Sequence, residues 1–470
     1  MSEQAGTTRG PAKVGSLAMW VLGFVVLVDA ADQSILRGVQ SLIQKEFHVG
    51  DATIGFLASV FIFVNALTTV PAGYLADRLN RRRVIAWTIV VWSGITAMTG
   101  LAQTFLVLML IRASLGFGLG ITEPSANSLL TDLYPTNQRG RAFSIQQLLQ
   151  FVGLGVGIGA GGAIGSALGW RWAFVLVGVP GVLTALAVLR LREPKRGHGD
   201  RLSLGLHSSL DDADEKPPLF EHGFTTFIAD MARGLRDDVK TIAQIPTLRF
   251  VLVGVGVLLF AVQGIGFWLP VYHERFLHLS VAEATSAVGA VVVLGGVGGT
   301  LLGGVIADRF QNRIKGARVA IPAVCIMGGS VLLALSFTPI GVGGSLIVQT
   351  LSVFVFTLAI PALRAGLSDA VPADLRGAGF AAFALISAMF GAAAAPVIGA
   401  VSDATNLRVA FLATTPTIFL GAVVLFQARR HLDEDVGKVM LAVQRAYQEQ
   451  MALEERRQAE EHGQPAPASD

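Results

Sequence analysis

Long apolar runs recur along the whole chain and are separated by short polar stretches. Twelve of these runs approach or exceed the roughly 20 residues that a membrane-spanning helix needs. They fall into two sets of six, at residues 17–38, 53–76, 84–102, 105–131, 142–168 and 171–190, and at 247–272, 284–307, 317–338, 341–369, 378–400 and 409–428. The pattern predicts an all-α polytopic membrane protein with twelve transmembrane helices in two six-helix bundles.

The polar remainder divides the chain into five regions. Residues 1–16 form an N-terminal tail, and residues 191–245 form a charged linker between bundles at 17–190 and 246–430. Residues 431–470 form a C-terminal tail. The apolar segment after residue 16 is too long for the core of a signal peptide, so we expect a retained first helix.

Composition agrees with this class and narrows the chemistry. Hydrophobic residues make up 52% of the 470 positions and charged residues only 15%, which is far less charge than soluble proteins carry. The single cysteine, Cys325, excludes an intrachain disulfide. The sequence has no nucleophile–base cluster, no H-E-x-x-H or P-loop motif and no Cys/His metal set. We therefore expect no enzyme, no cofactor or metal and no nucleic-acid partner.

Basic residues are unevenly divided between the loops. Clusters such as Arg81–Arg83 and Arg429 with Arg430 lie in alternate loops, on the side of both termini, whereas the opposite loops carry only scattered basic residues. Because cytoplasmic loops carry the excess of Lys and Arg, we expect both termini and the linker to be cytoplasmic. The protein would be a multi-pass protein of the inner or plasma membrane, and we expect it to be a monomer.

The two halves resemble each other in sequence. A shift of 237 positions places "LLTDLYPTNQRG" on "GLSDAVPADLRG", so that Asp132 falls on Asp369 and Arg139 on Arg376. The second helix of each half also closes on a similar motif, "GYLADR" and "GVIADR". Parallel repeats of this kind are typical of six-plus-six transporters built about an axis along the membrane normal.

Three motifs resemble those of the major facilitator superfamily. "GYLADRLNRR" resembles its signature loop between helices 2 and 3, and "RASLGFGLG" resembles its fourth-helix motif. "GLGVGIGAGG" resembles the fifth-helix motif associated with antiporters, with Ile158 where that motif has proline. Within the superfamily, "FHVGDATIGFLASVFIF" before the signature loop is most similar to the spinster-like transporters, which are associated with lysolipids and sphingoid lipids.

The resemblance implies a set of proton-coupling residues. The family's first-helix Asp falls on Asp32, whose Arg neighbour is replaced here by Gln33, and its fourth-helix Arg falls on Arg112. The family's Glu position is Leu119, but Glu123 lies four residues on, about one turn further along the same face. The coupling role therefore extends to Asp32 and Arg112 by position and to Glu123 by analogy.

Five ionisable residues lie inside predicted spans of the first half: Asp29, Asp32, Arg37, Arg112 and Glu123. Each costs a few kcal/mol or more at mid-bilayer unless it faces a partner or a polar cavity. Our hypothesis is an Asp32–Arg112 pair with Glu123 as a separate proton site deeper in. A functional and a structural role stay open for Asp29, and we expect Arg37, near the outer end, to reach the membrane interface.

The second half is almost uncharged, so we expect a cavity with one polar and one apolar wall. Such a cavity suits an amphipathic substrate, and a lysophospholipid is the leading prediction, with protons and membrane lipid as further partners. Candidate substrate-binding residues are Asn65, Asn127, Gln146, Gln150, Gln263, Phe267, Trp268 and Arg364.

A second candidate site is a gate at the cytoplasmic ends of the helices. An acid at a helix end beside basic residues can meet a neighbouring helix N-terminus and stabilise one closed state. Its members would be Gly73, Asp77, Arg78, Arg82, Arg139, Asp308, Arg309 and Arg376.

The prediction is therefore a secondary active transporter that works by alternating access, with proton coupling and a lysophospholipid-like substrate. One alternative is a drug or organic-ion exporter of the same superfamily, with a closed vestibule instead of a lateral opening for a lipid tail. Another is a membrane receptor or scaffold that transports nothing. The intramembrane acids argue against the last.

Overall fold

The computed structural model describes residues 16–76, 79–194, 244–310, 316–370 and 376–441, and isolated helical positions at 198, 233, 236, 240, 444 and 448. The predicted N-terminal tail, most of the linker and most of the C-terminal tail lie outside the described residues. So do Asp77 and Arg78, two of the predicted gate residues.

The described residues form twelve long α-helices, one for each predicted span. Those of the first half are α1 (Leu17–Phe47), α2 (Asp51–Ala76), α3 (Arg81–Thr99), α4 (Phe105–Leu133), α5 (Thr136–Leu168) and α6 (Trp170–Leu189). Those of the second half are α9 (Pro246–Phe276), α10 (Val281–Phe310), α11 (Ala317–Ser336), α12 (Gly341–Ala370), α13 (Arg376–Ala404) and α14 (Leu407–Gln427).

Helix α1 differs most from its prediction, because it ends at Phe47 and not at residue 38. Residues 39–47 include Gln40, Gln44, Lys45 and Glu46, which made this stretch too polar for a membrane span. In the structure Gln40 and Gln44 are buried against other helices. The polar residues therefore extend the helix beyond the apolar run, and its left-handed cap falls at His48.

The membrane character of the fold is clear from its helices. Among the described residues, ten helices are long and apolar enough to cross a membrane. The exceptions are α3, which opens with three arginines, and α13, whose apolar part within the described residues, Ala388–Ala404, is shorter. The chain is thus a multi-pass membrane protein, as predicted.

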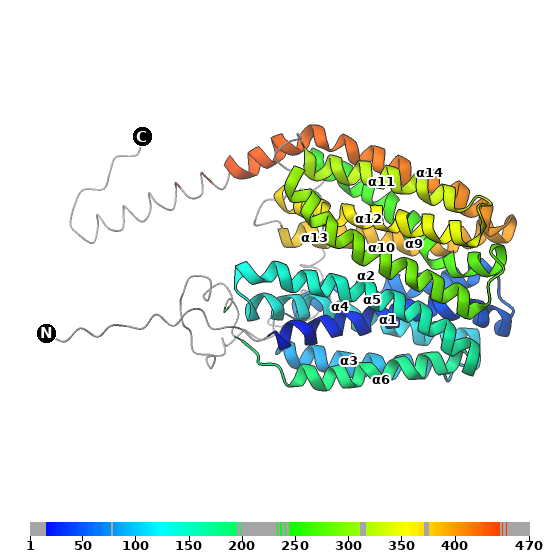
Figure 1. Cartoon of the computed structure of the whole chain (residues 1–470). Helices are drawn as coiled ribbons and strands as arrows, with labels where there is room; N and C mark the ends of the chain where they lie inside the picture. Colours follow the sequence, from blue (N-terminus) through cyan, green and yellow to red (C-terminus); the bar gives the residue numbers. More distant parts are fainter. Residues whose placement is uncertain are drawn as a thin grey trace, which may run out of the picture.

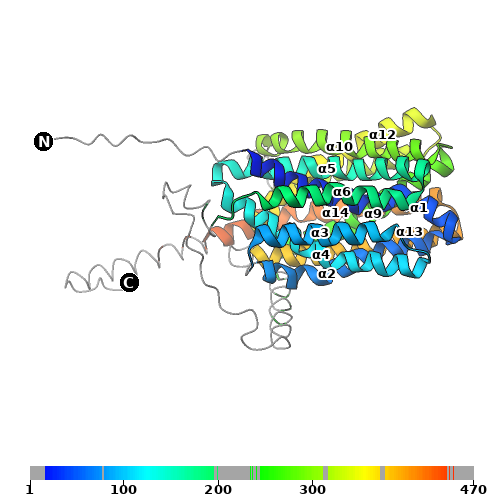
Figure 2. The ribbon, with the colours of Figure 1, turned by 90° about the horizontal axis from the view of Figure 1, so that it is seen from below.

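The helices are arranged in two bundles, α1–α6 and α9–α14, which lie one above the other in Figure 1. The bundles meet along two helix pairs, α2 with α13 and α5 with α10. Figure 2 shows α5 running beside α10. We name the two ends of the molecule after α1: the Leu17 end, where α1 begins and α14 ends, and the Phe47 end, where α1 ends and α2 begins.

Glycines allow close helix contacts inside each bundle. Gly254 of α9 and Gly421 of α14 face each other, and a Cβ at Gly254 would lie 2.8 Å from the Gly421 carbonyl oxygen and 2.9 Å from the Leu425 nitrogen. These neighbours are backbone atoms, which cannot rotate away. The contact between α9 and α14 therefore requires glycine at this position.

Gly254→Ala should destabilise the C-terminal bundle by about 1–3 kcal/mol, because the added methyl group overpacks a backbone contact. The measurement is the melting temperature of the purified protein in detergent. Gly328→Ala on α11 is the matched control, since nothing lies within 4 Å of its added Cβ. That change should leave the melting temperature unchanged or raise it. Equal losses in the two variants would contradict the packing argument.

Candidate functional site

One face of α1 carries a polar stripe: Asp29, Gln33 and Arg37, each about one helical turn after the last. Gln33 Nε2 donates a hydrogen bond of 2.9 Å to Asp29 Oδ1. Arg37 Nη2 lies 3.5 Å from Oε1 of Gln263 on α9. The stripe therefore faces the interface between the two bundles.

Arg37 does not turn toward the membrane interface, contrary to our expectation. The expectation assumed that α1 ends near residue 38, whereas the helix continues for about two and a half further turns to Phe47. Arg37 is consequently too deep to reach the interface, and it contacts Gln263 of the other bundle instead.

The carboxylates of Asp29 and Glu123 lie within electrostatic reach of each other and repel. Glu123 is on α4 next to Pro124 and is exposed, whereas Asp29 on α1 is partly buried. Our hypothesis treated Glu123 as a separate site and left Asp29 open. In the structure Asp29 is near enough to both Glu123 and Asp32 to feel their charges.

Asp32 and Arg112 lie inside the N-terminal bundle, with 2% and 1% of their surfaces exposed. Their charges attract each other, but no ion pair or hydrogen bond joins the two side chains among the described residues. The Arg112 guanidinium lies 5.6 Å from the ring centre of Phe61 and 5.5 Å from that of Phe174. Since Arg112 Nε and Nη1 have no hydrogen-bond partner within the described protein, the guanidinium is stabilised by these aromatic faces and by longer-range attraction to Asp32.

The candidate amides differ in their surroundings. Gln150 accepts a 2.7 Å hydrogen bond from Gln147 on the same helix, α5. Gln146 is buried, and Asn65 on α2 and Asn127 on α4 are partly buried. Gln263 contacts one of the predicted charged residues, Arg37, across the interface between the bundles.

Phe267 and Trp268 on α9 belong to the packed core. Trp268 is fully buried, and its indole nitrogen donates to the Ala395 carbonyl of α13 at 2.9 Å. Phe267 stands perpendicular to Trp268, with ring centres 5.1 Å apart, and its carbonyl accepts from Gln40. The structure thus places both aromatic rings in helix packing. The side chain of Arg364, the remaining substrate candidate, lies outside the described residues.

A cluster at the Phe47 end joins the two bundles, and we call it the clasp. Its centre is Asp51, the first residue of α2, whose carboxylate accepts two hydrogen bonds of 2.7 Å from Arg275 of α9. Ser402 of α13 donates to the same carboxylate at 2.6 Å and Gln44 of α1 at 2.7 Å. Asp51 is thus bound from both bundles at once.

Two further contacts complete the clasp. Asp403 of α13 accepts from the backbone nitrogens of Asp51 and Ala52, both at 2.9 Å, so it caps α2 from the opposite bundle. Ser41 of α1 donates to Glu274 of α9 at 2.9 Å. A polar cavity of about 790 Å³ lies among these residues at the Phe47 end.

The sequence did not reveal the clasp. Arg275 is one of the scattered basic residues of the opposite loops, and Asp51 lies inside the stretch "FHVGDATIGFLASVFIF" that carries the family resemblance. The one available signal was an acidic residue at the start of an apolar helix. Its partners from the other bundle, Arg275 and Ser402, lie more than 200 positions away in the chain.

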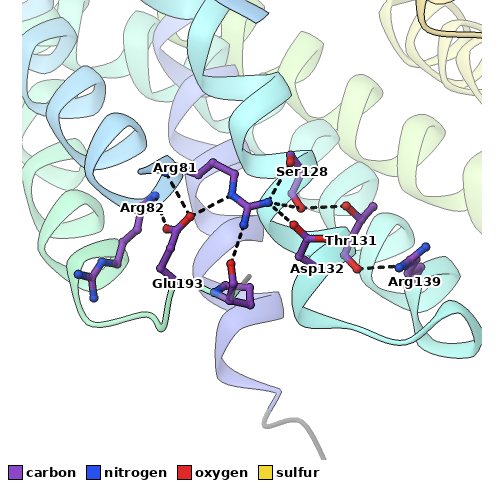
Figure 3. Close-up of polar contacts among 8 residues, drawn as sticks. Arg81, Arg82, Ser128, Thr131, Asp132, Arg139 and Glu193 are labelled. Carbon is purple, nitrogen blue, oxygen red and sulfur yellow. Dashed lines mark hydrogen bonds and ion pairs between the residues drawn. The ribbon is translucent and has the colours of Figure 1, made fainter. Parts of the chain in front are cut away.

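At the Leu17 end, Arg81 organises a network inside the N-terminal bundle (Figure 3). Its side chain is 2% exposed and forms ion pairs with Asp132 at the end of α4 and with Glu193, at 3.0 Å, after α6. It also donates to Ser128 at 3.0 Å and to the Pro194 carbonyl at 2.9 Å. The sequence presents Arg81 only as one member of a basic cluster, so this role was not predicted.

Two predicted gate residues bind within their own half. The Arg82 backbone nitrogen donates to Glu193 at 2.9 Å, and its side chain donates to the Leu191 carbonyl at 2.8 Å. Arg139 Nε donates to the carbonyls of Thr131 and Tyr134, each at 3.1 Å. These bonds hold α3 and α5 to neighbouring segments of the same bundle.

Tyr134 anchors the start of α1 to the end of α4. Its hydroxyl oxygen accepts a 2.9 Å hydrogen bond from the Met19 backbone nitrogen. Burial raises the pKa of Tyr134 above the ordinary value of a phenol, so the side chain stays neutral at physiological pH.

The other predicted gate residues are described only in part. Gly73 lies within α2, and Arg309 is exposed in the last turn of α10. The side chains of Asp308 and Arg376 lie outside the described residues, as do Asp77 and Arg78.

Comparison with known proteins gives consistent matches. A family model described as Major Facilitator Superfamily matches residues 22–396. The chain is 25% identical over 336 residues to the sphingosine-1-phosphate transporter SPNS2 of Danio rerio, covering 68% of this chain and 62% of that protein. It is 23% identical over 322 residues to a probable L-galactonate transporter of Escherichia coli, covering 67% and 66%. The chain thus spans less than two thirds of the length of these relatives.

The fold also matches a solved structure. A bacterial homolog to the human lysosomal transporter Spinster, in an inward-facing and unoccupied conformation, superimposes with a TM-score of 0.73. The two chains are 23% identical, and the match covers 91% of this chain and 99% of that one. The likeness establishes a common fold.

Arg275→Gln should open the Phe47 end, because it leaves the buried Asp51 carboxylate without its ion-pair partner at a cost of about 3–5 kcal/mol in the closed arrangement. The measurement is the labelling rate of Ser41→Cys, made in a Cys325→Ser background, with a membrane-impermeant maleimide. We expect the rate to rise at least about tenfold. Arg171→Gln is the control, since Arg171 pairs with Glu46 of its own bundle at the same end. An unchanged rate in Arg275→Gln would show that the clasp does not keep this end closed.

Proposed function

The chain belongs to the Major Facilitator Superfamily, and on this premise we propose that it moves an amphipathic lipid by proton-coupled alternating access. The observation that carries the proposal is the clasp, which links the bundles at the Phe47 end, together with two intramembrane acids, Asp29 and Glu123, that feel each other's charge. Alternating access needs contacts between the halves that form and break, and proton coupling needs carboxylates in the space between them.

The distribution of basic residues supports an orientation. It places the Leu17 end in the cytoplasm and the Phe47 end outside. On that basis the clasp is an outer gate. Hydrogen bonds between the two halves run from the middle of the helices toward this end, from Ser59 with the Ala392 carbonyl to Asp51 with Arg275. Their release would admit solvent to the acids from outside.

The arrangement of charges supports proton coupling. Asp29 and Glu123 repel each other while both are charged, and a proton bound to either relieves the repulsion. Asp32 is buried and is attracted by the positive charge of Arg112. In this proposal Glu123 loads and releases the proton, while the Asp32–Arg112 pair links α1 to α4.

The two walls of the interface support an amphipathic substrate. The N-terminal bundle contributes the charged stripe of α1, and in this proposal partly exposed rings of the C-terminal bundle, such as Phe260 and Phe354, form the apolar wall. A relative is described as a sphingosine-1-phosphate transporter, which handles a lipid with one chain and a charged head. A lysophospholipid has the same general form. We propose that a monomer of the protein is the transporting unit.

A smaller organic ion is the second candidate. One relative is described as a probable L-galactonate transporter, and its substrate is a sugar acid without an apolar tail. The same polar stripe could hold such a molecule, but the apolar wall would then have no ligand to contact.

Glu123→Gln should abolish the dependence of transport on a proton gradient, because the amide keeps the shape of the side chain and cannot carry a proton. The measurement is flux in proteoliposomes with and without an imposed pH difference. Glu434→Gln is the control, since Glu434 is exposed and pairs only with Lys438 one turn away on the same helix. If transport by Glu123→Gln keeps its full dependence on the proton gradient, Glu123 is not the proton-binding residue.

The substrate class has its own test. Wild-type proteoliposomes should move a labelled lysophospholipid faster than protein-free liposomes, and an outward-to-inward pH difference should change the rate. Labelled L-galactonate is the parallel probe. Transport of the sugar acid alone would replace the lipid proposal with the organic-ion alternative, and no flux of either probe would favour a protein that transports nothing.

A further inference from the structure

An arginine that has no acidic partner among the described residues lies between the two bundles. This residue, Arg37, is partly buried, and the described part of the chain offers it no ion pair. Its polar contact is a neutral amide, the Gln263 side chain on α9, at 3.5 Å. Asp29, on the same face of α1, lies eight residues away, about 12 Å along the helix, and is bound by Gln33.

The helices are loosely packed on the side of this arginine that faces Gly266 and Gln263. A Cβ at Gly266 would have only Arg37 within 4 Å, at 3.7 Å, and one at Gly391 would have only Gln263, at 3.8 Å. At the clasp, by contrast, a Cβ at Gly399 would lie 2.6 Å from the Asp51 backbone. One turn beyond Arg37, Gln40 already bonds to the Phe267 carbonyl of α9. The tight contact between the bundles therefore extends from the clasp to Gln40, and the more open part of the interface begins at Arg37.

The ligand that suits the space at Arg37 follows from the difference between a guanidinium and a carboxylate. A carboxylate in a membrane can become neutral by taking a proton, but a guanidinium stays charged at any physiological pH. A cation that cannot discharge and has no carboxylate partner needs an anion from outside the protein. Asp29 and Glu123 need no ligand ion, since a bound proton neutralises a carboxylate.

We propose that Arg37, with Gln263 beside it, is an anion subsite that binds the oxyacid group, phosphate or carboxylate, of the transported molecule. The substrate is then an anionic amphiphile whose head lies below the clasp and whose tail extends toward the Leu17 end, past the acids. An organic cation does not fit this site. This inference rests on the transport function proposed above and assigns its substrate charge.

The test measures binding to the full-length protein in detergent. Three probes separate head from tail: a lysophosphatidic acid, a monoacylglycerol with the same acyl chain, and glycerol 3-phosphate. Wild type should bind the lysophosphatidic acid at least about tenfold more tightly than the neutral monoacylglycerol, the size of one charged hydrogen bond. Arg37→Gln should bind the two lipids equally, whereas Arg37→Lys should keep most of the preference. Arg430→Gln, at an exposed arginine of the Leu17 end, is the charge-matched control and should behave as wild type.

The outcomes are distinct. If Arg37→Gln elutes as a folded protein and keeps the preference for the anionic lipid, the subsite is wrong while the lipid function stands. If glycerol 3-phosphate binds in an Arg37-dependent manner and neither lipid binds, the anion subsite is right and the lipid function is wrong. If wild type binds none of the three probes, both proposals fall.

Discussion

The structure depends on one constraint: charged side chains inside the bilayer have no water to solvate them. A bilayer offers no hydrogen bonds, so every charge inside it has to be met by the protein or by a ligand. Arg112 meets two aromatic faces and is attracted by Asp32, and Asp29 meets an amide. The charges that find no counterpart within their own bundle, above all Arg37, lie where the two bundles face each other. The unmet charges therefore mark the functional interface.

Buried charges are paired differently at the two ends of the molecule. At the Leu17 end, Arg81 binds Asp132 and Glu193, which both belong to its own bundle, so the network holds that bundle together as one body. At the Phe47 end, Asp51 is bound by Arg275 from the other bundle, and Asp403 caps α2 across the gap. Two carboxylates can lie that close only because a guanidinium and a helix N-terminus neutralise them. A contact that depends on donors from both bodies can be lost when the bodies move apart, whereas the Arg81 network can move as a unit.

How far the sequence could predict this arrangement depends on the range of each interaction. Apolar runs are local, so every helix was found, and the superfamily resemblance was confirmed. Intramembrane charge is also local, so Asp32, Arg112 and Glu123 could be singled out. Partners are not local: nothing near Asp51 in the sequence indicates Arg275, and nothing near Arg37 indicates Gln263. The error over Arg37 had the same origin, because the polar residues that lengthen α1 make sense only when the helices they contact are known.

Comparison of the two repeats shows which features the halves share and which belong to one half alone. Pro124 in α4 and Pro361 in α12 occupy equivalent positions and each interrupt the backbone hydrogen bonds of a membrane helix. The residue before Pro124 is Glu123, whereas the residue before Pro361 is Ile360. The proline is therefore shared by both halves, and the acid that repels Asp29 is present in one. Because the ionisable residues of the predicted spans lie almost entirely in the first half, the two bundles present surfaces of different polarity to each other.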